Sequence, residues 1–224
     1  MAKEVIKLSK DSLEIIKNAS LINNSLKFTA TNEIKTIAAS GAIIMEATLA
    51  EVFPKEFSVY ELNKFLSVLN LATMKDAELV FEDDKLVTIQ SGKSKINYYF
   101  TSQQFVQHPN KAIKLPSVEL ETEIDAETLE GFTKAASALG HKMMIFRVSA
   151  KKSYLVATTP ELDTSNDYVF ELGDVDTVDG DYKLKIENLK LIPGDYEVQI
   201  SAKGLAAFKH KTRPIMFYMG LERT

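Results

Sequence analysis

The sequence predicts an α+β protein in which two similar domains each contain two copies of one unit: a strand, an amphipathic helix, a hairpin and a further strand. Three observations lead to this prediction. Apolar residues alternate between strand and helix periods four times along the 224 residues. Residues 148–156 and 200–208 resemble each other as hairpins that share a Ser-Ala-Lys turn. Residues 103–118 show little periodicity and contain two prolines, which is typical of a connection between domains.

The first unit is expected at residues 5–49. A helix is predicted at residues 10–19 because apolar side chains recur there with a period of about 3.6, and Ser9 and Asp11 are candidate caps. The apolar side chains on one face of this helix are Leu13, Ile16 and Ala19. The strands of this unit are expected at residues 5–8, 26–30, 34–37 and 42–49.

The second unit repeats this order at residues 57–100. Its helix is predicted from an apolar face formed by Leu62, Phe65, Leu66 and Leu69. Its strands are expected at residues 57–59, 78–81, 86–89 and 96–100. The two units together predict an N-terminal domain at residues 1–103, and Pro109 and Pro116 mark an interdomain linker at residues 104–118.

The C-terminal domain is expected at residues 119–224 and repeats the pattern twice. In the third unit Asp125 is the predicted N-cap of a helix whose apolar face holds Leu129, Phe132 and Ala136. In the fourth unit a helix at residues 187–191 is barely a turn and a half long, because Pro193 ends it. The strands of the two units are expected at residues 120–124, 144–148, 154–157, 168–172, 182–186, 196–201, 205–209 and 214–219.

Composition indicates a soluble globular protein with 45% hydrophobic residues, enough for a core in each domain. There is no Cys, no secretory leader and no apolar run of about 20 residues, so we expect a cytoplasmic protein without disulfides or membrane spans. A net charge of −4 disfavours binding of nucleic acid through a globally basic surface but allows a local basic patch.

No motif predicts catalysis, a cofactor or a metal site. Residues 91–94 resemble the end of a phosphate-binding loop, but Val87 stands where that loop requires Gly, so a turn between strands is the better interpretation. Four acidic residues near Gly180 depart from calcium-loop spacing and predict a solvated loop, and three histidines are too far apart for a typical ligand set. These residues are Asp174, Asp176, Asp179, Asp181, His108, His141 and His210. We therefore expect a protein that is not an enzyme.

The four units in two domains resemble the sliding clamps that tether DNA polymerases, which are related in fold to proliferating cell nuclear antigen. The chain length and residues 7–11 are most similar to the clamps of T-even-type bacteriophages, and the resemblance spans residues 5–221. Residues 125–129 and 191–196 carry it best. The resemblance implies inner helices backed by outer antiparallel sheets, with six domains, and hence three chains, in a closed ring.

The resemblance also implies the function and the partners. A homotrimeric ring would encircle double-stranded DNA without sequence specificity and make the replicative DNA polymerase processive. A separate ATP-driven clamp loader would open and load it, and phage clamps of this type also serve late transcription. A ring can combine weak contacts with lasting attachment, because release requires opening an interface rather than breaking phosphate contacts.

Three sets of site residues follow from the resemblance. The helix lysines that would face DNA are Lys10, Lys17, Lys64, Lys75, Lys134 and Lys142. The subunit interface would join two strands through Ile96, Tyr98, Phe100, Tyr168, Phe170 and Leu172. The pocket for a hydrophobic partner peptide would be formed by Phe105, Val106, Ile113, Leu115, Pro116 and Phe217.

Two other classes of protein stay open at the level of sequence. A β-rich enzyme can assemble its site from scattered residues and leave no local motif, and a phage capsid or tail protein can also be β-rich and oligomeric. The four helices at corresponding places favour the clamp, because each needs a sheet to bury its apolar face.

Overall fold

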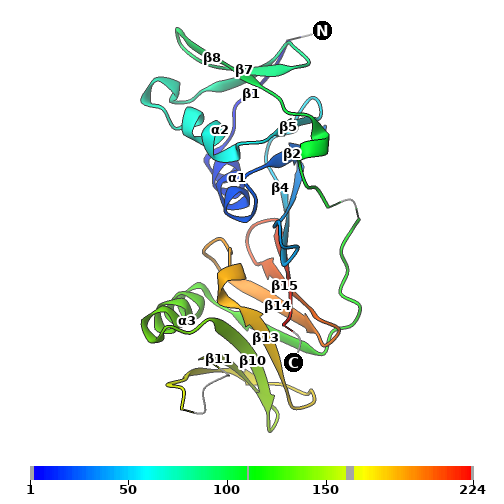
Figure 1. Cartoon of the computed structure of the whole chain (residues 1–224), viewed down its shortest axis with the longest axis vertical. Helices are drawn as coiled ribbons and strands as arrows, with labels where there is room; N and C mark the ends of the chain where they lie inside the picture. Colours follow the sequence, from blue (N-terminus) through cyan, green and yellow to red (C-terminus); the bar gives the residue numbers. More distant parts are fainter. Residues whose placement is uncertain (1–2, 110, 160–163, 223–224) are drawn as a thin grey trace. The chain divides into compact units, whose positions relative to one another are not determined.

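The computed structural model describes residues 3–109, 111–159 and 164–222, which divide into two compact units (Figure 1). Unit 1 holds the described residues of 1–40 and 44–110, and unit 2 holds 41–43 and the described residues of 111–224. The change of unit between residues 110 and 111 falls inside the expected linker. The linker bounds of 104–118 stay a prediction.

Unit 1 contains two α-helices that pack beside each other, α1 (Lys10–Ile22) and α2 (Leu62–Leu69). One antiparallel sheet has the order β1 (Glu4–Ile6), β6 (Glu78–Phe81), β7 (Leu86–Ser91) and β8 (Ser94–Tyr99). A second antiparallel set has the order β5 (Phe57–Val59), β2 (Leu26–Phe28), β3 (Glu33–Ile37) and β4 (Ile43–Thr48). Short 3-10 turns follow at η1 (Ala72–Met74) and η2 (Gln103–Phe105).

Unit 2 repeats the plan around one α-helix, α3 (Ala126–Leu139). One antiparallel sheet has the order β12 (Tyr168–Asp174), β11 (Lys152–Thr158), β10 (Met143–Ser149) and β13 (Gly180–Lys185). A second antiparallel set has the order β16 (Ile215–Gly220), β15 (Leu205–His210), β14 (Tyr196–Ser201) and β9 (Leu120–Ile124). A 3-10 turn, η3 (Ile186–Asn188), follows β13.

Local sequence explains where the helices begin and end. The Ser9 hydroxyl caps α1 by accepting from the Ser12 N–H at 3.1 Å, and the Asp125 carboxylate caps α3 by accepting from the Thr128 N–H at 2.7 Å. The α3 helix ends at Gly140, whose φ of 73° lies in the left-handed region that glycine adopts without strain. Sequence signals of this kind place both ends of the longest helix.

Aromatic side chains organise the core of each unit. In unit 1 the ring of Phe28 stacks on Phe57 at 4.5 Å and meets Phe53 edge-on at 4.9 Å. In unit 2 the Tyr196 ring lies 6.4 Å from that of Phe208, and its hydroxyl donates to the Ile192 carbonyl at 2.5 Å. Burial raises the pKa of the Tyr196 phenol well above its usual range, so this donor stays protonated.

The structure corrects the prediction of a fourth helix. No α-helix occupies residues 187–191; the described chain there forms only the turn η3 (Ile186–Asn188). A stretch this short cannot offset the cost of helix nucleation, and Pro193 follows before further turns can form. The described residues therefore contain three α-helices. Only three of the four predicted strand-helix-hairpin-strand repeats are complete.

A second correction concerns the buried face of α1. The predicted face included Leu13, but that side chain is only half-buried. The side chains that α1 buries fully are Ser12, Ile15, Ile16 and Ala19. Ser12 was missed because it is polar, yet its hydroxyl accepts from the Ala50 N–H at 3.2 Å, which makes its burial tolerable.

Gly194 is required by the packing around His210. Its φ is +154°, and a Cβ built at this position would lie 2.3 Å from Nε2 of the buried His210 ring. We expect Gly194→Ala to destabilise the protein by about 2–4 kcal/mol through backbone strain and overpacking. Urea denaturation would measure this change. The matched control is Gly131→Ala inside α3, where no atom lies within 4 Å of the added Cβ and a gain of about 0.5–1 kcal/mol is expected. Equal effects of the two changes would contradict this account.

Candidate nucleic-acid interface and assembly edges

The helices of unit 1 expose lysines on the side away from the core. Lys10 and Lys17 of α1 are both exposed and lie seven residues apart on one face, while Ile16 is fully buried. On α2, Phe65 is buried and the adjacent Lys64 is exposed. The structure therefore leaves these three predicted lysines available to a ligand on the helix surface.

The remaining predicted lysines are also exposed. Lys134 lies on α3, away from the buried Phe132. Lys75 follows the turn η1, and Lys142 lies between α3 and β10. Contact of all six lysines with DNA stays a prediction.

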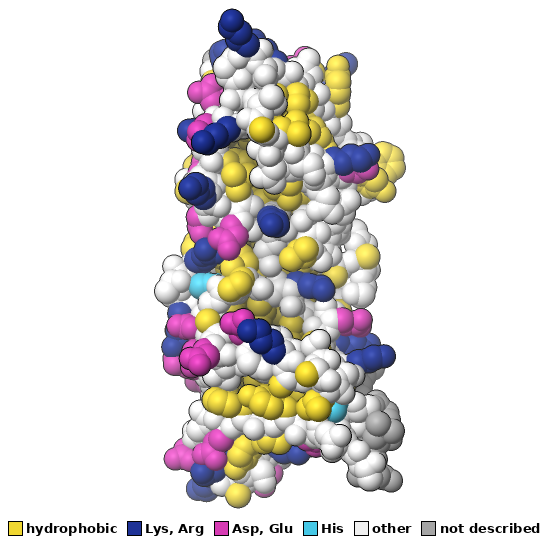
Figure 2. Space-filling view, turned by 90° about the vertical axis from the view of Figure 1, so that its left-hand side faces the viewer, with side chains coloured by type: hydrophobic (Ala, Val, Ile, Leu, Met, Phe, Trp, Pro, Cys, Tyr) yellow, Lys and Arg dark blue, Asp and Glu magenta, His cyan; other side chains and the backbone are white. Residues whose placement is uncertain are grey.

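Several of these lysines lie beside a carboxylate. The ammonium of Lys64 pairs with Glu61 at 2.7 Å, one helical turn away, and that of Lys134 pairs with Glu130 at 2.5 Å. Lys134 lowers the pKa of the Glu130 carboxyl, mainly through this hydrogen bond. In Figure 2 Lys and Arg side chains are interspersed with Asp and Glu, so the surface in this view is mixed in sign rather than uniformly basic.

The structure adds Lys7 to the exposed lysines that lie beside a carboxylate. Its ammonium lies 3.0 Å from the carboxylate of Asp76, and Lys7 is the main cause of a lowered pKa at Asp76, with smaller contributions from Lys75 and Lys10. Three lysines, two near the N-terminus and one adjacent in sequence, thus act on the Asp76 carboxylate. The sequence predicted Lys7 as a strand residue and as part of residues 7–11, which resemble the phage clamps. It did not predict the ion pair with Asp76, because contacts between distant segments are not visible in local patterns.

The first assembly edge is β8 in unit 1. Among the described strands, β8 pairs only with β7, so it forms the edge of its sheet. The predicted interface residues Ile96, Tyr98 and Phe100 are half-buried, whereas Tyr99 is 68% exposed. The Tyr98 hydroxyl donates to the Glu61 carbonyl at 3.1 Å, which fixes this strand against the start of α2.

The second assembly edge is β12 in unit 2. Within the described chain its sheet partner is β11, and its other side has no strand neighbour. Tyr168 and Leu172 are half-buried, while Val169 and Phe170 expose 56% and 37% of their surface. An apolar edge of this kind invites pairing with another chain. Its role as a subunit interface stays a prediction.

The structure contradicts the predicted peptide pocket at Phe217 and leaves Val106 little exposed surface. Phe217 is fully buried in the core of unit 2 and lies 6.3 Å from the Tyr196 ring, so a docking peptide cannot reach it. Val106 is also buried, with 9% of its surface exposed. Phe105 is exposed at 62%, and Ile113, Leu115 and Pro116 are half-buried or exposed, but the described residues of this set are divided between the two units.

Alternation along β16 explains the error and indicates better residues. Successive side chains of a strand point to opposite faces, so when Phe217 points into the core its neighbours Met216 and Tyr218 point outward. Both are half-buried. The sequence shows an unbroken apolar run here, and such a run does not reveal which residues face out.

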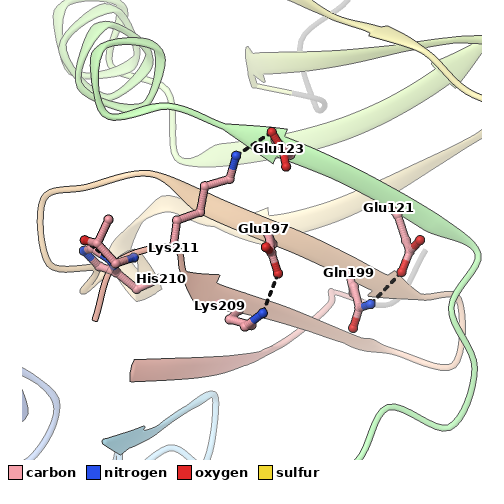
Figure 3. Close-up of polar contacts among 8 residues, drawn as sticks. Glu121, Glu123, Glu197, Gln199, Lys209, His210 and Lys211 are labelled. Carbon is pink, nitrogen blue, oxygen red and sulfur yellow. Dashed lines mark hydrogen bonds and ion pairs between the residues drawn. The ribbon is translucent and has the colours of Figure 1, made fainter. Parts of the chain in front are cut away.

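Polar contacts join β15, β14 and β9, the other strands of this set (Figure 3). On β14 and β15, Glu197 accepts from Lys209 at 2.7 Å, and across to β9 the Gln199 amide donates to Glu121 at 2.5 Å. Lys211 donates to Glu123 at 2.5 Å. These contacts place charged and polar side chains on one face of β9, β14 and β15.

The motifs that were set aside have structural roles. Residues 91–94 form the turn between β7 and β8, with Gly92 at a φ of 56°. Asp181 holds Arg147 through two hydrogen bonds of 2.8 and 2.9 Å, and Asp179 accepts from the Ala150 N–H in the turn between β10 and β11. No group of His, Cys, Asp and Glu among the described residues could hold a metal ion. Nor is any described helix long and apolar enough to cross a membrane.

Two of the three histidines are held by hydrogen bonds rather than grouped in a site. The ring of His141 contacts the Thr159 hydroxyl at 3.0 Å and the Asn166 carbonyl at 2.9 Å. His210 accepts at Nδ1 from the Thr212 N–H at 3.2 Å. Burial, followed by the charge of Lys27, lowers the pKa of His108. Holding loops is therefore the better interpretation of His141 and His210.

Known proteins decide the family. The sequence model described as DNA polymerase processivity factor matches residues 9–108. A sliding clamp of Vibrio phage KVP40 is 31% identical over 180 residues, which cover 77% of this chain and 80% of that protein. The chain belongs to the sliding-clamp family. A sliding clamp of Enterobacteria phage T4 is 32% identical over 134 residues, covering 60% of this chain and 58% of that relative.

Solved structures agree on the fold. PCNA from A. fulgidus, solved bound to the C-terminal region of FEN-1, matches with a TM-score of 0.74 at 11% identity over 100% of this chain and 99% of that one. PCNA from Thermococcus kodakaraensis matches with a TM-score of 0.73 at 13% identity, over 98% and 99% of the two chains. The predicted clamp fold and the resemblance to phage clamps are thereby confirmed. Membership of this family of processivity factors also supports a protein that is not an enzyme.

The corrected pocket can be checked by comparing two phenylalanines. We expect Phe217→Ala to destabilise the protein by about 3–5 kcal/mol, because it removes a fully buried ring. Phe105→Ala should change the free energy of unfolding by no more than about 0.5 kcal/mol, because that ring is 62% exposed. Urea unfolding of both variants would measure the difference. A small loss at Phe217 would return this residue to the list of surface candidates.

Proposed function

We propose that three copies of this chain close into a ring around double-stranded DNA and tether the replicative DNA polymerase. The observation that supports this most directly is the pair of edge strands: β8 ends one sheet in unit 1, and β12 ends another in unit 2. Pairing β8 of one copy with β12 of the next is a head-to-tail contact, and such contacts form a closed ring when the rotation between copies permits. Each chain has two compact units, so three chains would supply the six domains that the resemblance implies for a closed ring.

The ring accounts for processivity without tight binding. A closed ring leaves DNA only when an interface opens, so the contacts inside it can stay weak and independent of sequence. The exposed lysines of α1, α2 and α3 would then attract the phosphate backbone while the ring slides. Attachment to DNA and affinity for DNA become separate properties.

The partners follow from the same proposal. A separate ATP-driven loader would open the ring, the polymerase would bind through a short hydrophobic peptide, and a role in phage late transcription would use the same docking surface. The protein would act in the cytoplasm of the host cell. In unit 1 the exposed Phe105 remains a candidate docking residue. In unit 2 the candidates are Ile113, Leu115 and Pro116, with Met216 and Tyr218 replacing Phe217.

The ring is tested first by the mass in solution. Light scattering across a dilution series should reach a limiting mass three times that of the 25.0 kDa chain. Phe170→Asp should raise the dissociation constant of the trimer at least about 100-fold, because it would bury an unpaired charge in the pairing edge. Val178→Asp is the control, since Val178 is 82% exposed and lies between β12 and β13. A monomer at every concentration of the unaltered protein would remove the ring.

The DNA-facing surface is tested by charge reversal. Replacement of four helix lysines by Glu, at Lys10, Lys17, Lys64 and Lys134, should shorten loader-dependent retention on nicked circular DNA at least about tenfold while the trimer persists. Retention is measured after gel filtration at several salt concentrations. The control reverses four other exposed lysines that lie off the helices, at Lys85, Lys151, Lys203 and Lys209. Equal losses in both sets would show that only net charge matters.

A further inference from the structure

The lysines on the helix surface are accompanied by acidic side chains. Counted with their N-cap residues, α1, α2 and α3 carry four lysines and six acidic residues, a balance of −2. The lysines are Lys10, Lys17, Lys64 and Lys134, and the acids are Asp11, Glu14, Glu61, Asp125, Glu127 and Glu130. A surface evolved only to attract phosphate would carry the opposite balance.

Helix capping explains some of these acids but not all. Asp125 caps α3, and Asp11 and Glu127 occupy first turns, where the helix dipole favours negative charge. Glu61 precedes α2 yet makes no capping hydrogen bond with its side chain; its carboxylate instead pairs with Lys64 at 2.7 Å. Glu130 lies beyond the first turn of α3 and pairs with Lys134 at 2.5 Å.

Asp76 is the third such acid, and it lies outside any helix. It pairs with Lys7 at 3.0 Å, and its backbone adopts a φ of +60°, which is uncommon for a residue other than glycine. Its pKa is lowered by Lys7 and, more weakly, by Lys75 and Lys10, so the carboxylate stays charged at neutral pH. One acid thus lies among three lysines of unit 1.

The lysines therefore fall into two classes. Lys7, Lys64 and Lys134 each have a carboxylate within 3.0 Å. Lys10, Lys17, Lys75 and Lys142 form no ion pair within the part of the chain that the structure describes. A paired lysine must give up its carboxylate to contact a phosphate, so it releases fewer counterions from DNA than an unpaired one.

We propose that Glu61, Asp76 and Glu130 attenuate the attraction of the ring for DNA by holding Lys64, Lys7 and Lys134 as internal ion pairs. This inference rests on the proposed function, in which the helix surface faces the duplex. The unpaired lysines then supply the net electrostatic contact, while the paired ones exchange between carboxylate and phosphate as the duplex moves past. The chemical class of ligand is the phosphate backbone of a duplex without regard to sequence.

Three substitutions remove the attenuating charges with little change of shape: Glu61→Gln, Asp76→Asn and Glu130→Gln. Asn is well tolerated at the positive φ of position 76, and no capping bond is lost at position 61. The melting temperature should stay almost unchanged, because exposed ion pairs contribute little to stability.

The control removes the same number of charges from the outer face of the unit 2 sheet: Glu121→Gln, Glu123→Gln and Glu197→Gln (Figure 3). Two of these acids pair with lysines in the same way, Glu123 with Lys211 at 2.5 Å and Glu197 with Lys209 at 2.7 Å. The third, Glu121, accepts from the Gln199 amide at 2.5 Å. The control set therefore matches the change in net charge, and two of its three acids match the test set in pairing with a lysine.

The experiment measures binding of each trimer to a short linear duplex with open ends over a salt series. We expect the test variant to bind at least about tenfold more tightly than the unaltered protein, with a slope of log K against log salt steeper by about one or more. One-dimensional diffusion along stretched DNA should be slower. The control variant should shift neither the slope nor the diffusion by a comparable amount.

Two results would overturn the inference: no change of slope in the test variant, or the same change in the control. Either result leaves the proposed function standing if the unaltered protein forms a trimer and is retained on circular DNA. Loss of both those properties in the unaltered protein would instead remove the ring itself, so the two failures are distinguishable.

Discussion

Burial of one face of each helix against antiparallel strands is the constraint on which the other features depend. A helix of the sliding-clamp fold can hide only one side, so α1 buries Ile15 and Ile16, and its opposite side, with Lys10 and Lys17, stays on the surface. The same division holds for α3, where Phe132 is buried and Lys134 is exposed. Packing therefore determines which side chains are exposed to a ligand. The sheets that complete the core are open, so each has edge strands. Two of these edge strands are β8 and β12.

In the proposed ring, the two edge strands would also be the means of assembly. An edge strand carries unpaired N–H and C=O groups, and natural proteins either protect such an edge or use it. Here the two edges lie in different units and are apolar in part, with Val169 of β12 and Tyr99 of β8 exposed. A head-to-tail contact between them satisfies the backbone groups of both strands at once. In the proposed ring, this contact would continue the pairing that already stabilises each sheet.

Sequence patterns anticipated the strands and three helices because periodicity reports directly on which residues are buried. They failed where burial depends on distant partners. Ser12 is buried because Ala50 supplies a hydrogen bond from another segment, and Phe217 could not be assigned to a face because the whole run of β16 is apolar. The prediction of a fourth helix failed for a local reason, because Pro193 leaves too few residues for stable helical turns. The ion pair of Lys7 was missed because its partner Asp76 is far away in the sequence.

The loss of the fourth helix and the mixed charge of the other three fit one physical requirement. A protein that must stay on DNA by topology gains nothing from strong phosphate contacts, since each contact made at one position has to be broken at the next. The chain carries a net charge of −4, and three of its exposed lysines are already neutralised by Glu61, Asp76 and Glu130. The absence of an α-helix at residues 187–191 removes one more helix surface that could carry lysines. In the proposed ring, Lys10, Lys17, Lys75 and Lys142 would attract the duplex. Closure of the ring would then supply the attachment that a basic surface would otherwise have to provide.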